Sequence, residues 1–371
     1  MNFKLHPLVA GVALLAATLS HAADSPDIKS LRVTATEAKG LTLAERESAK
    51  TLMPRVNMLP DAVFDYTAAA NKAAVGKGQG QLGSKGGAKA DHLFQVESAA
   101  PGAQDGSISP DAVGTGGLQF TSSRVSPKTL DTTFPVRTVG KLYFKIGSST
   151  YMCTGSVIKP GVVLTAGHCV HSGNASSTGW YNSFEFIPGY RKVGTTITKP
   201  YGSWTNYVTM YTSTDWYNSG GAVPNAGDWA LIVFNKDASN KRVGDYTGWL
   251  GWAYPSMIGK HMTVLGYPGN HDLGGQLHRV DSMVTDYGSL NTGTYGSDMQ
   301  GGSSGGPNVL NWRVDYTDSS TLPSENWGNV ATSVVSWGYV STTPKVQGGS
   351  QFNGVFANMV NAACTSYPWA C

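Results

Sequence analysis

The sequence predicts an all-β fold, either a closed antiparallel barrel or a sandwich of two sheets. Only 14% of the 371 residues are charged and 46 are glycine, a composition that suits short strands joined by many turns. From about residue 125 onward, short β-type runs are separated by turn signals such as Pro188-Gly189 and Gly274-Gly275. No alternation of strand and helix patterns is present, which argues against a parallel α/β sheet.

The strand pattern appears in a series of short stretches. They are residues 139–146, 155–165 with a turn at Pro160-Gly161, 230–234, 262–266, 280–286 and 330–337. Helical periodicity is found over residues 355–363, and one further short helix is expected around residues 43–52. We therefore expect a β-rich domain that ends in a helix.

The N-terminus has the pattern of a secretory signal peptide over residues 1–22. Lys4 supplies positive charge, residues 8–19 form a short apolar run, and Ser20-His21-Ala22 offers small residues where a signal peptidase reads them. A membrane anchor is the alternative, but the apolar run is well short of the ~20 residues needed to span a bilayer. We therefore expect export to the periplasm or the medium.

Residues 23–124 are expected to form a prosegment that is removed on maturation, which leaves a folded domain at 125–371. Within the prosegment, residues 68–117 are of low complexity and contain few apolar side chains, so we expect this stretch to be flexible. Composition alone leaves a retained flexible arm as the alternative.

The four cysteines indicate disulfides. Their number is even, and no pair has the C-x-x-C spacing of a metal site. Such bridges form in the oxidising compartment that a signal peptide implies. Of the three possible pairings we favour the near neighbours, Cys153 with Cys169 and Cys364 with Cys371.

The most informative stretch is Gly-Ser-Ser-Gly-Gly-Pro at 302–307, which holds a serine between glycines. A hydroxyl becomes a nucleophile when a base takes its proton and backbone N–H groups receive the developing oxyanion. The stretch also fits the G-x-S-x-G elbow of α/β-hydrolases, but that fold needs a histidine after the serine, and the last histidine here is His278. The subtilisin order needs an acid before the histidine and an α/β fold, and neither is indicated. The order that remains is His, Asp, Ser.

His168 and Asp228 are the candidates for the base and for the acid that orients it. His168 lies among small residues at a strand end beside Cys169, and an unperturbed imidazole titrates near pH ~6.5. Asp228 directly precedes the apolar run 230–234, where a carboxylate can be buried at a strand start. The alternatives lack such a strand context; they are His171, Asp215 and Asp245.

Three motifs in this order resemble the trypsin/chymotrypsin-like serine peptidases over about residue 120 to the C-terminus. They are Thr-Ala-Gly-His-Cys (165–169), Asp-Trp-Ala-Leu (228–231) and Gly-Ser-Ser-Gly-Gly-Pro (302–307). Cys153, sixteen residues before Cys169, matches the family bridge beside the catalytic histidine. Features typical of the bacterial glutamyl endopeptidase-like branch are Asp131-Thr132-Thr133 followed by Pro135, the turn Gly266-Tyr267-Pro268-Gly269 and Gly301 before the serine motif. The resemblance implies two antiparallel six-stranded β-barrels with the site between them, followed by a C-terminal helix.

The resemblance also implies a role for each site residue. Ser304 is the nucleophile, His168 is the general base and then acid, and Asp228 orients the imidazole. The N–H groups of Gly302 and Ser304 form the oxyanion hole. The implied substrate-binding residues are the backbone-pairing segment Ser336, Trp337 and Gly338 and, in the back strand of the specificity pocket, Gly354.

Activation departs from the pattern of the animal digestive members. Ser303 stands where those proteins carry an Asp that binds the freed N-terminus, so that ion pair is not expected here. Cleavage after Arg124 would free Val125 as a new N-terminus, and a cut slightly upstream fits the bacterial branch as well.

Specificity depends on Asp298, six residues before the nucleophile, which matches the pocket-floor carboxylate of trypsin. It predicts a preference for Arg or Lys before the scissile bond by charge complementarity. The glutamyl branch often has Asp at this place too, but Val335 and Ser336 occupy the position of its glutamate-reading histidine. A glutamate-specific enzyme is the alternative.

We therefore expect a monomeric, secreted serine endopeptidase that acts on proteins or peptides through an acyl-enzyme and uses no cofactor and no metal. The net charge of +3 is small for this length and gives no argument for a nucleic-acid or membrane partner. A catalytically silent binding protein on the same scaffold is the alternative class, although no triad residue is lost. Three further histidines are expected to be structural or on the surface; they are His261, His271 and His278.

Overall fold

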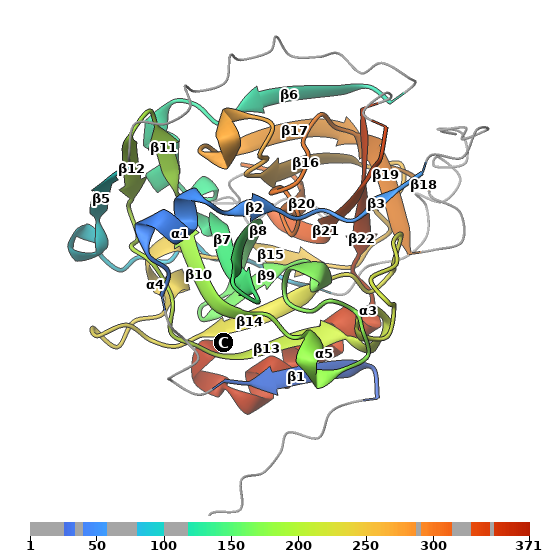
Figure 1. Ribbon diagram of the computed structural model, residues 1–371, viewed down its shortest axis with the longest axis horizontal. Helices are drawn as coiled ribbons and strands as arrows, with labels where there is room; N and C mark the ends of the chain where they lie inside the picture. The colour runs from blue at the N-terminus through green and yellow to red at the C-terminus, as the bar shows by residue number, and fades with distance from the viewer. Residues whose placement is uncertain are drawn as a thin grey trace, which may run out of the picture.

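The computed structural model describes residues 26–33, 40–57, 80–99, 118–286, 291–313, 328–341 and 345–371. These residues form two curled antiparallel sheets with a few short helices and a longer helix at the C-terminus (Figure 1). The predicted all-β class with a C-terminal helix is confirmed. The expected signal peptide lies outside the described residues.

The first sheet is built from strands whose buried positions are mostly apolar but include polar side chains such as Thr154, Glu185 and Thr212. Its strands are β7 (Val139–Ile146), β8 (Ser149–Lys159), β9 (Val162–Thr165), β10 (Asn182–Pro188), β13 (Tyr207–Ser213) and β14 (Ala230–Phe234), with β1 (Ile28–Arg32) and β2 (Lys50–Thr51) added from the N-terminal part. They lie in the order β1-β13-β14-β9-β8-β7-β10, with β2 on β8. The strands expected at 139–146 and 230–234 have those bounds. Because β14 pairs with β9, Thr165 and Ala230 become register partners although they are far apart in sequence.

In the second sheet, β17 (His278–Met283) and β18 (Thr285–Asp286) follow one another in the chain but lie toward opposite ends of the strand order. The other strands of this sheet are β15 (Gly251–Ala253), β16 (His261–Gly266), β19 (Thr292–Gly296), β20 (Pro307–Leu310), β21 (Val330–Tyr339) and β22 (Val346–Gln351), with β3 (Arg55–Val56), β4 (Gly80–Gln81) and β6 (Phe120–Arg124) added from the N-terminal part. The main order is β18-β19-β22-β21-β20-β16-β17-β6. The strand expected at 280–286 is thus divided at Val284 into β17 and β18, which pair at opposite ends of this order.

A small third sheet and several short helices connect these layers. The sheet is formed by β11 (Arg191–Val193), β12 (Thr196–Lys199) and β5 (Gln95–Ser98). The α-helices are α1 (Leu43–Glu47), α3 (Thr214–Tyr217), α4 (Val243–Thr247) and α5 (Gly354–Ser366). The 3-10 helices are η1 (Asp91–Leu93), η2 (Lys128–Thr132), η3 (Val136–Thr138), η4 (Gly167–Cys169), η5 (Ser177–Gly179), η6 (Asp272–Gly274) and η7 (Pro368–Ala370). No helix among these described residues is long and apolar enough to cross a membrane.

The C-terminal helix corrects one expectation about the specificity pocket. Gly354, expected in the back strand, is the first residue of α5. The Asn353 side chain accepts the N–H groups of Val355 and Phe356 and so starts the helix. Phe356 is buried edge-on against the Trp229 ring. The strand beside β21 is β22 instead.

Both expected disulfides are present. Cys153 on β8 is bonded to Cys169 in η4, and Cys364 in α5 is bonded to Cys371. The first bridge fixes the turn after β9 to the neighbouring strand, and the second closes the C-terminus.

The chain before residue 125 is more ordered than its composition predicts. Residues 80–99, which belong to the stretch expected to be flexible, form β4, η1 and β5 and pair with β15 and β12. The helix expected over 43–52 is shorter, since α1 ends at Glu47 and β2 begins at Lys50. In Figure 1 the blue run from α1 through β2 to β3 crosses the front of the molecule.

The expected boundary at residue 124 falls at the end of β6, where backbone pairing continues to Val125. β6 pairs along its length with β17, and Phe120 is buried. Val125 N donates to Leu277 O, and Arg124 Nε donates to Asp272 Oδ2 at 2.8 Å. A cut after Arg124 would therefore have to open regular backbone pairing in this form of the protein.

Candidate active site

The pairing of β9 with β14 brings His168 and Asp228 together. His168 follows Thr165 of β9, and Asp228 precedes Ala230 of β14. Because Thr165 and Ala230 are register partners, His168 and Asp228 lie at the same end of the two strands. Asp228 Oδ2 lies 2.8 Å from His168 Nδ1, and Asp228 Oδ1 accepts the backbone N–H of His168 at 2.7 Å. The side chain of Asp228 is 0% exposed and that of His168 is 3% exposed. The carboxylate therefore fixes the orientation of the ring and leaves Nε2 as the free nitrogen.

Ser336 is a further partner of this carboxylate. Its hydroxyl, fully buried on β21, donates to Asp228 Oδ2. A buried carboxylate needs its lone pairs satisfied, and this donor completes the set from the second sheet. The sequence placed Ser336 among the substrate-binding residues and did not indicate that its side chain would orient the acid.

The loop between β19 and β20 places Ser304 between the two sheets. Thr154 N on β8 donates to the Ser304 carbonyl at 2.8 Å, and Gly305 N donates to a carbonyl of β21. Gly302 and Gly305 have φ angles of 99° and 79°. A Cβ on Gly305 would lie 2.1 Å from Thr165 Oγ1. The motif needs glycine at these two places because the turn is left-handed and touches the end of β9.

A segment of the N-terminal part crosses this site. Ser304 Oγ donates a hydrogen bond to Leu52 O at 2.8 Å. His168 Nε2 is buried and has no hydrogen-bond partner within the described chain. The hydroxyl of Ser304 and the imidazole of His168 are therefore not linked in this state, because the hydroxyl is directed at the crossing chain. We call residues 50–56 the strap.

The side chain of Met53 lies beside the serine loop, between β21 and β22, and we call the place that it occupies the pocket. Met53 Sδ lies 3.7 Å from Gln347 Nε2, and a Cβ on Gly338 would lie 3.1 Å from the same sulfur. Gln347 also donates to Ser303 Oγ at 3.1 Å and accepts from Ser297 Oγ at 2.7 Å. The pocket thus combines a glycine wall on β21 with a neutral polar floor on β22.

The packing of Trp337 explains why the sequence pattern did not predict β22, the strand that holds Gln347. The Trp337 ring is fully buried and lies over Gly348, where a Cβ would come within 2.0 Å of it. Glycine is therefore required in the middle of β22, and the strand reads Val-Gln-Gly-Gly-Ser-Gln rather than as a β-branched run. The glycines of β22 therefore remove the β-branched pattern by which a strand is predicted from sequence.

Asp298 pairs with a histidine. His271 Nε2 lies 3.1 Å from Asp298 Oδ2, and the Asp298 side chain is 9% exposed. Burial alone would raise the pKa of Asp298, but the neighbouring His271 holds that pKa below its ordinary value. His271 also stacks on His278, with ring centroids 4.9 Å apart, and His278 Nε2 lies 2.7 Å from Asp272. The two stacked histidines thus lie between Asp298 and Asp272.

The alternative bases and acids are engaged elsewhere. His171 Nε2 lies 2.8 Å from Ser176 O within its own loop. Asp245 forms an ion pair with Arg242 at 2.7 Å. Asp215 lies in the first turn of α3.

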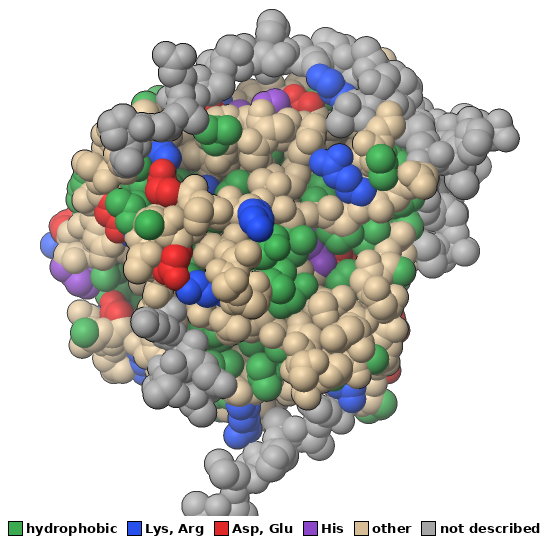
Figure 2. All heavy atoms as spheres, in the orientation of Figure 1, with side chains coloured by type: hydrophobic (Ala, Val, Ile, Leu, Met, Phe, Trp, Pro, Cys, Tyr) green, Lys and Arg blue, Asp and Glu red, His purple; other side chains and the backbone are tan. Residues whose placement is uncertain are grey.

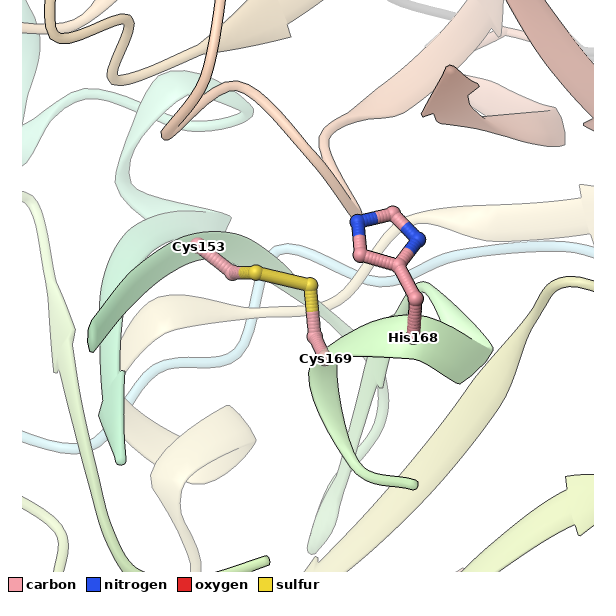
Figure 3. Close-up of side chains that lie close together, drawn as sticks. All are labelled: Cys153, His168 and Cys169. Carbon is pink, nitrogen blue, oxygen red and sulfur yellow. A yellow bond between two sulfur atoms is a disulfide. The ribbon is translucent and has the colours of Figure 1, made fainter. Parts of the chain in front are cut away.

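Cys153, His168 and Cys169 come together but do not fit a metal ion. Their potential ligand atoms lie within 4.8 Å of one another, and Figure 3 shows the ring beside the bridge. The two sulfurs are joined to each other, and Nδ1 of His168 is held by Asp228. Metal binding needs thiolates, and the disulfide leaves none here, so this cluster serves to anchor the histidine turn.

One family profile covers the region that builds this site. The trypsin family matches residues 133–358, more than half of the chain. The chain belongs to the trypsin family. The matched region of this trypsin-family protein contains His168, Asp228 and Ser304, as well as β8, β14 and β21, which hold them.

Curated relatives of this trypsin-family protein match over part of their length. The glutamyl endopeptidase of Bacillus licheniformis is 31% identical over 179 residues, which are 47% of this chain and 49% of that protein. The extracellular metalloprotease of Bacillus subtilis is 29% identical over 191 residues, which are 49% of this chain and 54% of that protein. The chain spans about half the length of the curated relatives it matches.

Two solved structures are similar in fold to this trypsin-family protein. The thermostable serine protease AL20 from an extremophilic microorganism has a TM-score of 0.50 and 25% identity, covering 65% of this chain and 100% of that one. The protease Anisep from Arthrobacter nicotinovorans has a TM-score of 0.50 and 27% identity, covering 63% of this chain and 98% of that one.

Proposed function

We propose that this chain is a secreted serine endopeptidase, synthesised as a precursor, that hydrolyses peptide bonds through an acyl-enzyme. The observation that carries the proposal is the buried His168–Asp228 pair at 2.8 Å beside the loop of Ser304. Family membership supports the same reaction. A silent binding protein is disfavoured because all three residues of the triad are present.

The first half of the reaction forms the acyl-enzyme. Ser304 Oγ attacks the substrate carbonyl carbon while His168 Nε2 takes the hydroxyl proton. The negative charge develops on the carbonyl oxygen, which accepts hydrogen bonds from the N–H groups of Gly302 and Ser304. The C–N bond then breaks, and His168 gives its proton to the leaving amine. Asp228 stays ionised and holds the imidazolium through Nδ1.

The second half returns the enzyme to its starting state. Water attacks the ester carbon, and His168 takes one of its protons. The bond between the acyl carbon and Ser304 Oγ breaks, and His168 returns the proton to Oγ. The products are the acid and amine halves of the substrate.

The proposed preference for Arg or Lys rests on Asp298. Its lowered pKa keeps the carboxylate charged, so a substrate cation could replace His271 as its partner. A second specificity has its own support, because Gln347 Nε2 is a hydrogen-bond donor that faces the occupied pocket. A glutamate or glutamine side chain could accept from it, and the name of the Bacillus licheniformis relative agrees with a glutamyl preference.

The name of the Bacillus subtilis relative implies a metal in that protein. Among the described residues of this chain, the cluster Cys153, His168 and Cys169 does not fit one, because both sulfurs are in a disulfide. We assign no step to a metal.

Export and processing complete the proposal. We propose that residues 1–22 direct secretion and that residues 23–124 form the prosegment, with the peptidase domain following. Two disulfides agree with an oxidising compartment. On the face shown in Figure 2, charged side chains of both signs are interspersed, which fits protein or peptide substrates better than a polyanionic partner. We propose that the protein is a monomer.

A peptide library tests activity and specificity together. The purified protein, with its prosegment released by an added protease that is then removed, should cleave library peptides, whereas Ser304→Ala prepared identically should not. Enrichment of Arg and Lys before the cleaved bond supports Asp298 as the residue that determines specificity. Enrichment of Glu or Gln there supports Gln347 instead. Equal cleavage by the Ser304→Ala protein would refute the proposal.

A further inference from the structure

We propose that the strap, residues 50–56, occupies the substrate cleft in the direction opposite to that of a cleaved substrate and keeps the enzyme latent without being cut. This inference rests on the function proposed above. It concerns the occupant of the cleft and its polarity, which family membership does not determine.

Backbone pairing sets the polarity of the strap. At its N-terminal end, Lys50 and Thr51 pair in parallel with Tyr151 and Met152 of β8. At its C-terminal end, β3 pairs in parallel with residues 338–339 of β21. Gly338 N donates to Pro54 O at 3.1 Å, and Val340 N donates to Val56 O at 3.0 Å. The N-terminal half of the strap thus lies over β8 and the C-terminal half over β21.

The reaction requires the reverse arrangement. The leaving amine belongs to the C-terminal half of a substrate and must take a proton from His168. His168 lies within 4.8 Å of the Cys153–Cys169 bridge that joins it to β8. The C-terminal half of a substrate therefore belongs over β8 and the acyl half over β21. The strap runs the other way.

The contact at the nucleophile is also unproductive. Ser304 Oγ donates its proton to the oxygen of the Leu52 carbonyl. Attack instead requires Oγ to face the carbonyl carbon and to give its proton to His168 Nε2. The strap therefore directs the Ser304 hydroxyl at a carbonyl oxygen instead of a carbonyl carbon, and His168 Nε2 has no hydrogen-bond partner among the described residues.

Side chains keep the strap in place. Met53 fills the pocket against Gln347, and Thr51 lies where a Cβ on Gly301 would come within 2.8 Å of it. Before the strap, Arg46 of α1 is buried and forms ion pairs with Glu185 at 3.1 Å and Glu97 at 2.6 Å. The strap is thus held at its centre by a pocket and at its start by buried charge.

Two readouts on the full-length chain test this inference: the rate at which a fluorophosphonate labels Ser304, and the intact mass. Met53→Asp places a carboxylate against the pocket and should label at least ~10-fold faster than wild type. Leu82→Asp, at a 64% exposed side chain of the same N-terminal part, is the matched control and should label like wild type. Thermal unfolding checks that both variants are folded.

Pro54→Ala tests the polarity independently of labelling. If the strap lay in the cleaved direction with Met53 in the pocket, only the following proline would protect the Met53–Pro54 bond, and Pro54→Ala would be cut there. The reversed strap predicts an uncut chain at this bond during prolonged incubation. Cleavage after Met53, or a Met53→Asp chain that labels at the wild-type rate, would overturn the inference. Absence of labelling in every form, including chain trimmed of its prosegment, would refute the proposed enzyme and the role of the strap together.

Discussion

The hydroxyl of Ser304 donates a hydrogen bond to the carbonyl oxygen of Leu52, 2.8 Å away. This single contact joins the serine motif to a residue 252 positions earlier in the chain. It explains why a buried His168–Asp228 pair coexists with an unpaired Nε2. Of the proposed triad, His168 and Asp228 are in contact, and the proposed contact between Ser304 and His168 is the one that the strap replaces.

Loss of the orienting acid should impair turnover far more than binding. Asp228→Asn keeps the size of the side chain but favours the wrong tautomer of His168, and kcat should fall by ~10⁴. Ser336→Ala removes one donor to the charged carboxylate, and kcat should fall by about 10- to 100-fold. Steady-state kinetics on the released enzyme measure both. Equal effects of the two variants would contradict the separate roles assigned to them.

Asp298→Asn tests which of two residues, Asp298 or Gln347, determines substrate specificity. If the carboxylate selects basic residues, kcat/KM for an Arg substrate should fall by about 10-fold or more relative to a Gln substrate, because a charge-assisted contact is lost. Gln347→Leu is the companion variant and should lower the Gln and Glu rates instead. An unchanged ratio in Asp298→Asn would remove Asp298 from the specificity site.

Arg46→Met should loosen the N-terminal part. It leaves Glu185 buried without its partner, a change that typically costs about 3–5 kcal/mol in the free energy of unfolding. Lys192→Met, which removes the exposed partner of Glu47, is the control and should cost less than about 1 kcal/mol. Urea unfolding of the full chain measures both values. Similar small losses would show that the buried ion pair does not anchor the strap.

Stability should fall in acid through Asp272. Burial opposes its ionisation, but hydrogen bonds from His278 and Arg124 lower the pKa of Asp272 from 3.8 to about 2. A carboxylate with a lowered folded-state pKa stabilises the fold above its unfolded pKa. This contribution, on the order of 1–2 kcal/mol, is lost as the pH falls from about 4 to about 2.

Unfolding of Asp272→Asn against pH checks this account. The variant should be less stable than wild type at pH 6, and the difference should shrink toward pH 2. Asp91→Asn, at an exposed position of η1, should follow the wild-type curve. A constant difference between Asp272→Asn and wild type across the range would contradict the assignment.

The sequence predicted those parts that local pattern determines. The strands at 139–146 and 230–234 are apolar runs between clear turns, and they have the expected bounds. The juxtaposition of His168 with Asp228 follows from the pairing of the strands next to them. The glycines of the serine motif are required by local φ values, so they are visible without tertiary information.

The remaining features depend on contacts between distant segments. Nothing local in Lys-Thr-Leu-Met-Pro-Arg-Val marks it as a cleft-filling strap, because its pairing is supplied by β8 and β21. β22 was missed because Trp337 requires a glycine at 348, and Gly354 was assigned to the pocket in its place. Residues 80–99 are of low complexity yet ordered, because edge strands of the domain provide their hydrogen bonds.

Mapping the residue that reacts with a fluorophosphonate tests the central claim most directly. After release of the strap, mass spectrometry should find one label per chain, on Ser304, and His168→Ala should slow its attachment by several orders of magnitude. A label on another residue, or undiminished labelling in Ser304→Ala, would contradict the claim that Ser304, His168 and Asp228 form the catalytic unit.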